Sequence, residues 1–488
     1  MSDSHTYLAL DLGAESGRGE LVTVADGKVT LAEVHRWPNR PVQLGGTLHW
    51  DLPFLFAEIV EAIAAAGRTA ANIEGISVDT WGVDFGLLGA NDELLGLPVN
   101  YRDARTQGIH EYSNPTMDVS EIFQKTAYEP WPIASLFQLL ALQRDGSALL
   151  PAAEAFLNMP DLLGFYLTGR KASEKSIANT TNLMGTDGRW CQEIVGRFNL
   201  PGEMLCELVE PATVLGPLRA ELAEATGVGE VPVIATCGHD TSAAVAAIPA
   251  EGENWAFLSS GTWSILGSLV DEPVPTPRCL ELGFTNEYTI GGWYLARNIS
   301  GLWMVQQLRK KWNTPAEPVD YPGMTAWAAE AETEAFFDAA DESLLAPADM
   351  EEAVTALIAK AGGPAPTGRG QVVRAVLQSL ALEYNRRLDA LGELTGQRPE
   401  CIYMVGGGIA NELLCQLTAD ACGVPLHAGA DQCTAMGNAL GQALALGVLS
   451  DRQDIREVMR ASFPPKTYTP RDEQAWAPRR QRYAERVS

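Results

Sequence analysis

The feature that most constrains this chain is a short pattern that occurs twice, separated by about half the chain. Residues 7–24 read as a strand, a turn of small and polar residues, and a second strand. Residues 255–270 repeat this order around a turn at Ser259–Thr262. Two copies of one unit predict a duplicated fold with two facing turns. Strand–turn–strand units are common, so the repeat alone identifies no family.

A chain of 488 residues is too long for one compact core, so two or three domains are expected. Besides strand patterns, the chain contains amphipathic helical patterns such as Gln371–Leu394. The Pro- and Gly-containing stretch Ile248–Asn254 is the most plausible boundary. The predicted division is an N-terminal domain, a C-terminal domain and a C-terminal extension, at residues 1–248, 254–450 and 451–488.

The net charge of -27, from 62 acidic and 35 basic residues, argues against nucleic acid or an anionic membrane as partner. Any site for an anionic ligand must therefore supply its own local positive field. The first residues, up to Asp11, contain no Lys or Arg and do not resemble a signal peptide. The eight cysteines lack CxxC spacing and the six histidines lack metal-ligand spacing. These features predict a cytoplasmic protein with reduced thiols and no zinc site.

Three glycine-containing turns could each bind phosphate. In Asp11–Arg18, backbone N–H groups can converge on an anion, Arg18 adds positive charge, and Asp11 can hold a magnesium ion. An ordinary hairpin explains this octapeptide equally well. The turn at Ser259–Thr262 has similar groups, and Gly406–Gly408 lies between a predicted strand and a predicted helix, where a nucleotide can approach the backbone. Three such turns in this order favour a phosphate-binding protein.

The run Gly238-His239-Asp240-Thr241 contains the best candidate for a general base. Asp240 is followed by small residues that predict the start of a helix, where the dipole favours a charged carboxylate. Such a carboxylate can accept a proton from an alcohol. The alternative is that Asp240 only caps the helix and His239 is packed in the core.

Taken together, these motifs resemble the FGGY carbohydrate kinases over roughly residues 6–450. The resemblance implies two actin-like (ribonuclease H-like) α/β domains flanking an ATP/sugar cleft. The residues that carry it are Asp79–Phe85, Tyr101–Thr106, Leu258–Ser264, Asn298-Ile299, Gly301–Trp303 and Gln306.

The resemblance implies ATP-dependent phosphorylation of a ketose, L-rhamnulose, at its O1 hydroxyl, with Mg²⁺ on the phosphates and Asp240 as catalytic base. Asp11 would be the magnesium-side carboxylate. The implied sugar contacts are Gly82, His239, Asp240, Thr241 and Trp81, although Trp81 fits the core equally well. The implied nucleotide contacts are Ala14, Glu15, Ser16, Gly17, Arg18, Thr262, Asn298, Gln306 and Gly407. A small hydroxyl residue is more usual at position 15, so Glu15 must turn outward or meet the metal.

Three alternatives remain open at this point. One is a kinase of the same family for another ketose, such as fuculose or xylulose. Another is a non-catalytic actin-like module that binds nucleotide and switches a partner, and the third is a structural protein without a site. The expected partners are a small-molecule ketose and ATP, in a monomer or a homodimer. The segment Thr314–Thr367, rich in Ala, Glu and Pro, is expected to carry little chemistry.

Overall fold

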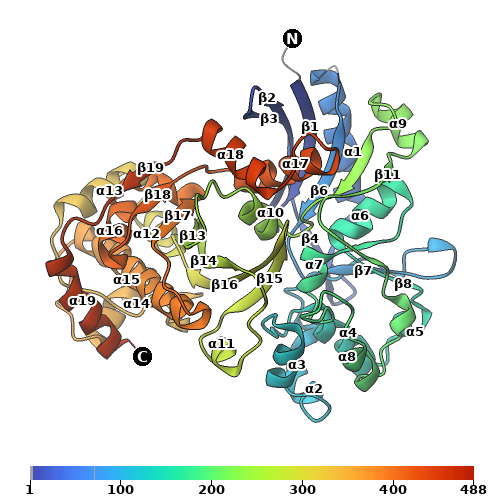
Figure 1. The fold of residues 1–488 in the computed structure, drawn as a ribbon. Helices are drawn as coiled ribbons and strands as arrows, with labels where there is room; N and C mark the ends of the chain where they lie inside the picture. Colours follow the sequence, from blue (N-terminus) through green and yellow to red (C-terminus); the bar gives the residue numbers. More distant parts are fainter. Residues whose placement is uncertain (1–3, 71, 488) are drawn as a thin grey trace. The chain divides into compact units, whose positions relative to one another are not determined.

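The computed structural model describes residues 4–70 and 72–487, which form two compact units (Figure 1). The first unit contains the described residues up to Ala247, together with Val270–Tyr294 and Gln432–Ser462. The second contains Ile248–Leu269, Leu295–Asp431 and the described residues from Phe463 on. Each unit is thus assembled from separate stretches of the chain. The three-part division expected from the sequence stays a prediction about folding domains.

The first unit is built on a six-stranded mixed sheet. The predicted strand–turn–strand unit of residues 7–24 is confirmed, because β1 pairs antiparallel with β2, and β2 in turn pairs antiparallel with β3. On its other side β1 pairs in parallel with β6, with Asp11 opposite Asp79. The order of the strands is β11 (Thr213–Pro217), β12 (Pro232–Ala235), β6 (Gly75–Thr80), β1 (Ser4–Leu12), β2 (Ser16–Ala25) and β3 (Lys28–Pro38).

Both faces of this sheet are covered by helices. On one face, Leu8, Leu10 and Leu12 share a hydrophobic cluster with Leu55 and Ile59 of α1 (Leu52–Thr69). Alternate residues of a strand point to opposite faces. The even-numbered leucines therefore make the core with α1, while Asp11 belongs to the other face.

Helix α17 (Cys433–Ala445) packs on that other face. Its Gln442 donates Nε2–H to the carbonyl oxygen of Leu8 at 3.0 Å. One turn earlier, Asn438 donates Nδ2–H to Oδ2 of Asp79 at 2.6 Å. A polar helix face thus covers the polar end of the two central strands.

Shorter elements complete the first unit. Its remaining strands are β4 (Pro41–Leu44), β5 (Thr47–Trp50), β7 (Phe85–Leu88), β8 (Ala155–Asn158), β9 (Ser173–Glu174), β10 (Leu208–Val209) and β15 (Thr285–Thr289). Its remaining α-helices are α2 (Ile109–Ser113), α3 (Val119–Thr126), α4 (Ser135–Arg144), α5 (Leu149–Ala152), α6 (Met159–Thr168), α7 (Lys175–Asn179), α8 (Gln192–Arg197), α9 (Ala220–Thr226), α10 (Asp240–Ala246), α11 (Pro277–Glu281) and α18 (Arg452–Ser462).

The second unit repeats the central arrangement of the first. Strand β13 pairs antiparallel with β14 and parallel with β17, as β1 does with β2 and β6. The duplication predicted from the two turns is therefore confirmed at the level of strand pairing. The strand order is β16 (Gly292–Ser300, of which Leu295 onward belongs to this unit), β14 (Trp263–Val270, up to Leu269), β13 (Trp255–Ser260), β17 (Cys401–Val405), β18 (Leu426–Ala428) and β19 (Lys466–Tyr468).

Six α-helices complete the second unit. The helix predicted at Gln371–Leu394 is slightly longer, and the one predicted from Asn411 starts one residue later, because Asn411 is its N-cap and accepts Leu414 N–H at 3.0 Å. The helices are α12 (Trp303–Trp312), α13 (Tyr321–Glu330), α14 (Met350–Lys360), α15 (Arg369–Thr395), α16 (Glu412–Cys422) and α19 (Glu473–Arg486).

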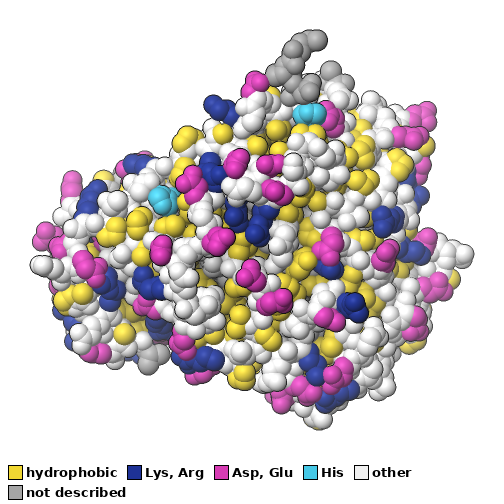
Figure 2. All heavy atoms as spheres, viewed as in Figure 1, with side chains coloured by type: hydrophobic (Ala, Val, Ile, Leu, Met, Phe, Trp, Pro, Cys, Tyr) yellow, Lys and Arg dark blue, Asp and Glu magenta, His cyan; other side chains and the backbone are white. Residues whose placement is uncertain are grey.

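The distribution of thiols and charges agrees with the composition. All eight cysteines are free thiols, and five of them are buried. On the face shown in Figure 2, acidic and basic side chains are interspersed. Ion pairs among the described residues include Arg36 with Glu33, Lys171 with Asp92 and Lys311 with Asp349. Within residues 4–70 and 72–487, no helix is long and apolar enough to cross a membrane.

Candidate active site

The first predicted phosphate turn joins β1 to β2. The N–H of Gly13 donates to the carbonyl oxygen of Ser16 at 2.9 Å, and Asn39 donates to the carbonyl oxygen of Gly13 at 2.5 Å. Arg18 lies across the strand pair from Asp11, with its Nη2 3.2 Å from Asp11 Oδ2. The turn is thus fixed at both ends, and it carries one guanidinium group.

Two residues of this turn, Glu15 and Gly17, differ from what is expected in a simple phosphate-binding loop. A Cβ on Gly17 would lie 2.3 Å from the Trp37 ring, so glycine is needed there for packing rather than for a left-handed backbone. Glu15 is exposed. The carboxylate at the unusual position thus lies in solvent.

Asp11 and the neighbouring Asp79 form a buried pair of carboxyl groups. Burial raises the pKa of Asp11 to about 6, against the lowering effect of Arg18. Burial also raises the pKa of Asp79, opposed by its hydrogen bond from Asn438. Oδ1 of Asp79 is buried and accepts no hydrogen bond from any described residue. A hard cation with oxygen ligands would neutralise such a pair, so the chemistry of these residues fits a magnesium ion.

Glu20 lies beside this pair on β2 and gives a testable pH dependence of stability. It is 1% exposed, and burial raises its pKa to about 7, although Arg18 Nη1 lies 3.9 Å from its Oε1. A carboxyl group with a raised folded-state pKa binds its proton more tightly when folded. The free energy of unfolding should therefore fall as the pH rises through the window between the unfolded pKa of 4.5 and about 7.

Between pH 5 and pH 8, we expect the Glu20 carboxyl group to lower the free energy of unfolding of the wild type by about 2 kcal/mol. In Glu20→Gln this decrease should be absent. Urea unfolding curves of both proteins at the two pH values measure it. Glu224→Gln, at an exposed position of α9, is the control that should leave the pH dependence nearly unchanged. A parallel pH dependence in Glu20→Gln and the wild type would contradict the prediction.

The candidate base begins a helix, as the sequence predicts. His239 occupies the N-cap of α10 without a side-chain capping bond, and Asp240 is the first helical residue. Oδ1 of Asp240 accepts the N–H of Thr241 at 2.5 Å and its hydroxyl at 3.1 Å. Among the described residues no donor is hydrogen-bonded to Oδ2. Asp240 is therefore not the cap, and its side chain, 31% exposed, keeps one oxygen available for a proton.

The loop after β6 lies against this run. Thr80 N–H donates to the carbonyl oxygen of Gly238 at 2.8 Å. Trp81 is buried, packs at a tilt against Trp50 with 3.9 Å between ring centroids, and donates its indole N–H to Asp84 at 3.0 Å. Gly82 is only half-buried. The structure thus brings Gly82 near the base-bearing run, whereas most of Trp81 is core.

Asp84 and Val83 are residues at this loop for which no role was predicted. Val83 has φ of 69°, a strained value for a β-branched residue. Asp84 is fully buried and accepts indole N–H groups from Trp50 at 2.6 Å and from Trp81. Gln138 donates Nε2–H to Asp84 Oδ1 at 3.0 Å and also contacts the carbonyl oxygen of Val83. Hydrogen bonds to the Asp84 carboxylate thus hold the strained loop. Close packing alone would not require a carboxylate at this buried position.

Glu174 fixes the backbone that precedes the base. It is 1% exposed, and it accepts the N–H of Gly238 at 2.8 Å and the N–H of Ser176 at 2.7 Å. Burial raises its pKa to about 7, and these hydrogen bonds oppose the rise. No single motif could reveal this contact, because Glu174 lies 64 residues before Gly238.

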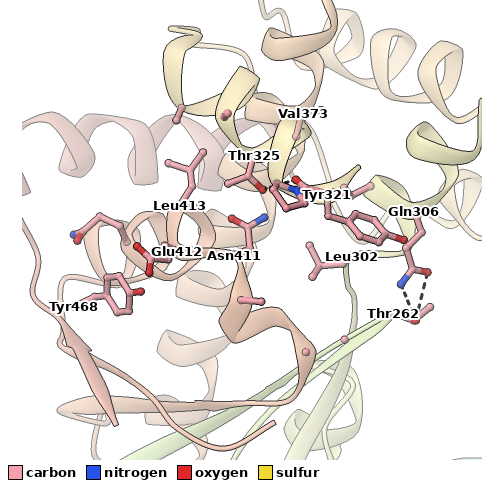
Figure 3. A pocket seen from close by; sticks show the side chains of 18 of the residues that line it. Thr262, Leu302, Gln306, Tyr321, Thr325, Val373, Asn411, Glu412, Leu413 and Tyr468 are labelled. Atoms are coloured by element: carbon pink, nitrogen blue, oxygen red, sulfur yellow. Dashed lines mark hydrogen bonds between the residues drawn. The ribbon is translucent and has the colours of Figure 1, made fainter. Parts of the chain in front are cut away.

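The second unit contains a cavity of about 900 Å³ (Figure 3). Three predicted nucleotide contacts line it: Thr262, Gln306 and Gly407. Gln306 donates Nε2–H to Thr262 Oγ1 at 3.1 Å, at one side of the cavity in Figure 3. Asn298, by contrast, is exposed on β16 and does not line the cavity. The cavity is large enough for a nucleotide-sized ligand.

Several lining residues come from segments to which the sequence assigned no role. In Figure 3, Tyr321 and Thr325 of α13 point into the cavity beside Asn411. Tyr468 of β19 lies at its far side. Helix α13, which lies in the segment Thr314–Thr367 expected to carry little chemistry, thus contributes to the cavity wall, while the expectation itself stays a prediction. The amphipathic pattern of this helix is weak, so nothing in the sequence shows which side of α13 faces a ligand.

Two family models match nearly the whole chain. The model of the N-terminal domain of the FGGY family of carbohydrate kinases matches residues 6–247, and the model of the C-terminal domain matches residues 256–446. The chain belongs to the FGGY family of carbohydrate kinases. It is a sugar kinase, acting on a small-molecule sugar with ATP as co-substrate.

Among curated proteins, a rhamnulokinase from Bacteroides thetaiotaomicron is 38% identical over 96% of this chain and 97% of its own. A rhamnulokinase from Oceanobacillus iheyensis is 34% identical over 94% and 97%. Among solved structures, a ligand-bound xylulose kinase from Lactobacillus acidophilus matches with a TM-score of 0.83 at 20% identity, covering 99% of this chain and 97% of that chain. A glycerol kinase with ADP from Plasmodium falciparum matches with a TM-score of 0.81 at 16% identity and the same coverage. These structures confirm the predicted actin-like fold class.

Proposed function

We propose that this sugar kinase transfers the γ-phosphoryl group of ATP to the O1 hydroxyl of L-rhamnulose, with Asp240 as the general base. The observation that carries the proposal is the Asp240 carboxylate itself. One of its oxygens is fixed by Thr241, and the other, at a partly exposed position, has no donor among the described residues. General-base assistance of this kind typically contributes about 10²–10⁴-fold in rate.

In the proposed reaction, Oδ2 of Asp240 accepts the O1 proton while O1 forms a bond to the γ-phosphorus. The bond between that phosphorus and the β,γ-bridging oxygen breaks, and ADP leaves with the electron pair. Positioning and charge neutralisation supply most of the remaining acceleration in phosphoryl transfer. Asp240 therefore needs a fixed direction more than an unusual basicity.

The proposed contacts fall into two groups. The sugar contacts are Gly82, His239, Asp240 and Thr241, with the edge of Trp81 as a wall. The nucleotide contacts are Thr262, Gln306 and Gly407 in the cavity, the turn Ala14–Arg18 (Ala14, Glu15, Ser16, Gly17 and Arg18) and Asn298. Glu15 would contribute its backbone rather than its exposed side chain.

Magnesium is the proposed metal, held by Asp11 directly or through water. A magnesium ion held there would supply positive charge that neutralises the charge of the phosphates. Arg18, 3.2 Å from Asp11, orients that carboxylate and adds a positive charge next to the turn.

The choice of L-rhamnulose is supported by the names of the two curated relatives, each aligned over more than nine-tenths of both chains. L-Fuculose and D-xylulose are the competing ketoses. The alternative from another class of protein is a non-catalytic module that binds nucleotide and switches a partner without acting on a ketose.

A panel of ketoses tests this assignment. We expect kcat/KM for ADP release to be at least about tenfold higher with L-rhamnulose than with L-fuculose or D-xylulose. Phosphorus NMR of the product should place the phosphate on O1. A higher kcat/KM for another ketose would reassign the substrate within the family. ADP release that no ketose stimulates would favour the nucleotide switch.

A further inference from the structure

The imidazole ring of His239 lies between two carboxylates of the first unit. Its Nε2 is 3.5 Å from Oδ1 of Asp240, and its Nδ1 is 3.2 Å from Oε2 of Glu287. The side chain of His239 is 12% exposed and that of Glu287 is 7% exposed. Both contacts are attractive only when both ring nitrogens carry hydrogen, because a carboxylate oxygen accepts and does not donate.

The same carboxylate oxygen of Glu287 is also held by a tyrosine. It lies on β15, and the hydroxyl of Tyr294 donates to its Oε2 at 2.5 Å. Ser242, on the first turn of the base-bearing helix α10, lies 3.1 Å from that hydroxyl and 3.4 Å from His239 Nδ1. The carboxylate of Glu287, the ring of His239 and the start of α10 thus form one closed network.

The charges around the ring favour its protonated form. Burial alone lowers the pKa of His239, but the hydrogen bond and charge of Glu287, with the charges of Asp240 and Glu174, raise it above its ordinary value. A buried carboxylate is costly unless it is paired, and such a pair is a weak source of stability. The fold alone therefore gives little reason for a charge at position 287.

We propose that Glu287 is a positioning residue for phosphoryl transfer, which holds His239 so that its Nε2–H points to Asp240 and fixes the direction of that carboxylate. The inference rests on the proposed role of Asp240 as base. The proton of the sugar hydroxyl goes to Asp240 alone, while His239 keeps both of its protons and Glu287 remains a carboxylate. Glu287 acts only through His239 and does not touch the reacting atoms.

The test is Glu287→Gln, which keeps the shape of the side chain and removes its charge. We expect kcat to fall about 10–100-fold, as when a partner that orients a reacting group is removed. KM for ATP should stay close to wild type, whereas the midpoint of urea unfolding should fall, because the buried imidazolium of His239 loses its charged partner. Glu58→Gln is the matched control, because it breaks another His–Glu pair of the same unit, with His35 Nε2 2.6 Å from Glu58 Oε2. That control should keep wild-type kcat.

Combining Glu287→Gln with Asp240→Asn separates the two proposals. If Glu287 acts through the base, the double variant is no slower than Asp240→Asn alone. An additional loss equal to that of Glu287→Gln alone would overturn the positioning role. Near-normal turnover of Asp240→Asn would instead refute the base. Asp240→Asn with low turnover, beside Glu287→Gln at wild-type kcat, would refute only the role of Glu287.

A spectroscopic measurement on the unaltered protein covers the case in which Glu287→Gln does not fold. With ¹⁵N-labelled histidine, the His239 signals are assigned by their loss in His239→Gln. We expect both ring nitrogens of His239 to be protonated at pH 7. A neutral ring at pH 7 would overturn the inference, because Nε2 or Nδ1 would then face a carboxylate without a hydrogen.

Discussion

Replacing Asp240 with Asn should lower kcat about 10³-fold while folding and ATP binding stay near wild type. The amide has almost the same shape as the carboxylate, but it cannot accept the hydroxyl proton. The contact of Oδ1 with Thr241 can be kept by the amide oxygen, so the start of α10 should not move. Steady-state kinetics with a ketose, a nucleotide-binding titration and urea unfolding together measure the three properties.

Asp26→Asn is a matched control for this substitution. Asp26 is exposed in the turn between β2 and β3, and its φ of 52° suits Asn as well as Asp. We expect wild-type kinetics and stability for this control. If Asp240→Asn also kept turnover within a few-fold of wild type, the base would have to be another residue.

The substitution Gly437→Ala adds only one methyl group, but it should lower the free energy of unfolding strongly. Gly437 lies in α17, and a Cβ there would be 1.8 Å from the carbonyl oxygen of Ala243 in α10. Backbone cannot yield as a flexible side chain does, so the helices must separate. Overpacking of this kind costs about 1–3 kcal/mol or more. Because Asp240 is the first residue of α10, kcat should fall together with the free energy of unfolding.

Gly196→Ala is the control for the same chemical change within a helix. A Cβ at Gly196 in α8 meets no heavy atom within 4 Å, so alanine should be neutral or stabilising by up to about 1 kcal/mol. Urea unfolding and kcat of both variants measure the difference. Wild-type stability and kcat in Gly437→Ala would show that the spacing of α10 and α17 does not hold the base.

The parts of this structure that were predicted correctly depend on residues that are close together in the sequence. The apolar strand patterns and the turn of small and polar residues between them predicted the pairing of β1 with β2, and small residues after Asp240 predicted the start of α10. The second turn gave the repeated strand pairing of the other unit. These features are local, because the periodicity of apolar residues and the residues that favour turns act over only a few positions in the sequence.

The parts that the sequence did not predict depend on contacts between distant residues. Glu174 and Glu287 lie 66 residues before and 47 residues after Asp240, yet one holds the backbone of Gly238 and the other the ring of His239. Each is an unremarkable acidic residue in its own neighbourhood. The lining of the nucleotide-sized cavity by Tyr321 was missed for the same reason, since a weakly amphipathic helix does not reveal which side faces a ligand.

The position of α17 has a consequence for how this chain folds while it is being synthesised on the ribosome. Strands β1 and β6 are complete by residue 80, but α17, which covers one of their faces, begins only at Cys433. Until then the polar edge with Asp79 lacks its bond from Asn438, and α10 lacks its contact at Gly437. The first unit therefore cannot complete its fold during synthesis of its own N-terminal half. A nascent chain stalled before residue 433 should be more easily cleaved by protease within residues 4–247 than one released after residue 462.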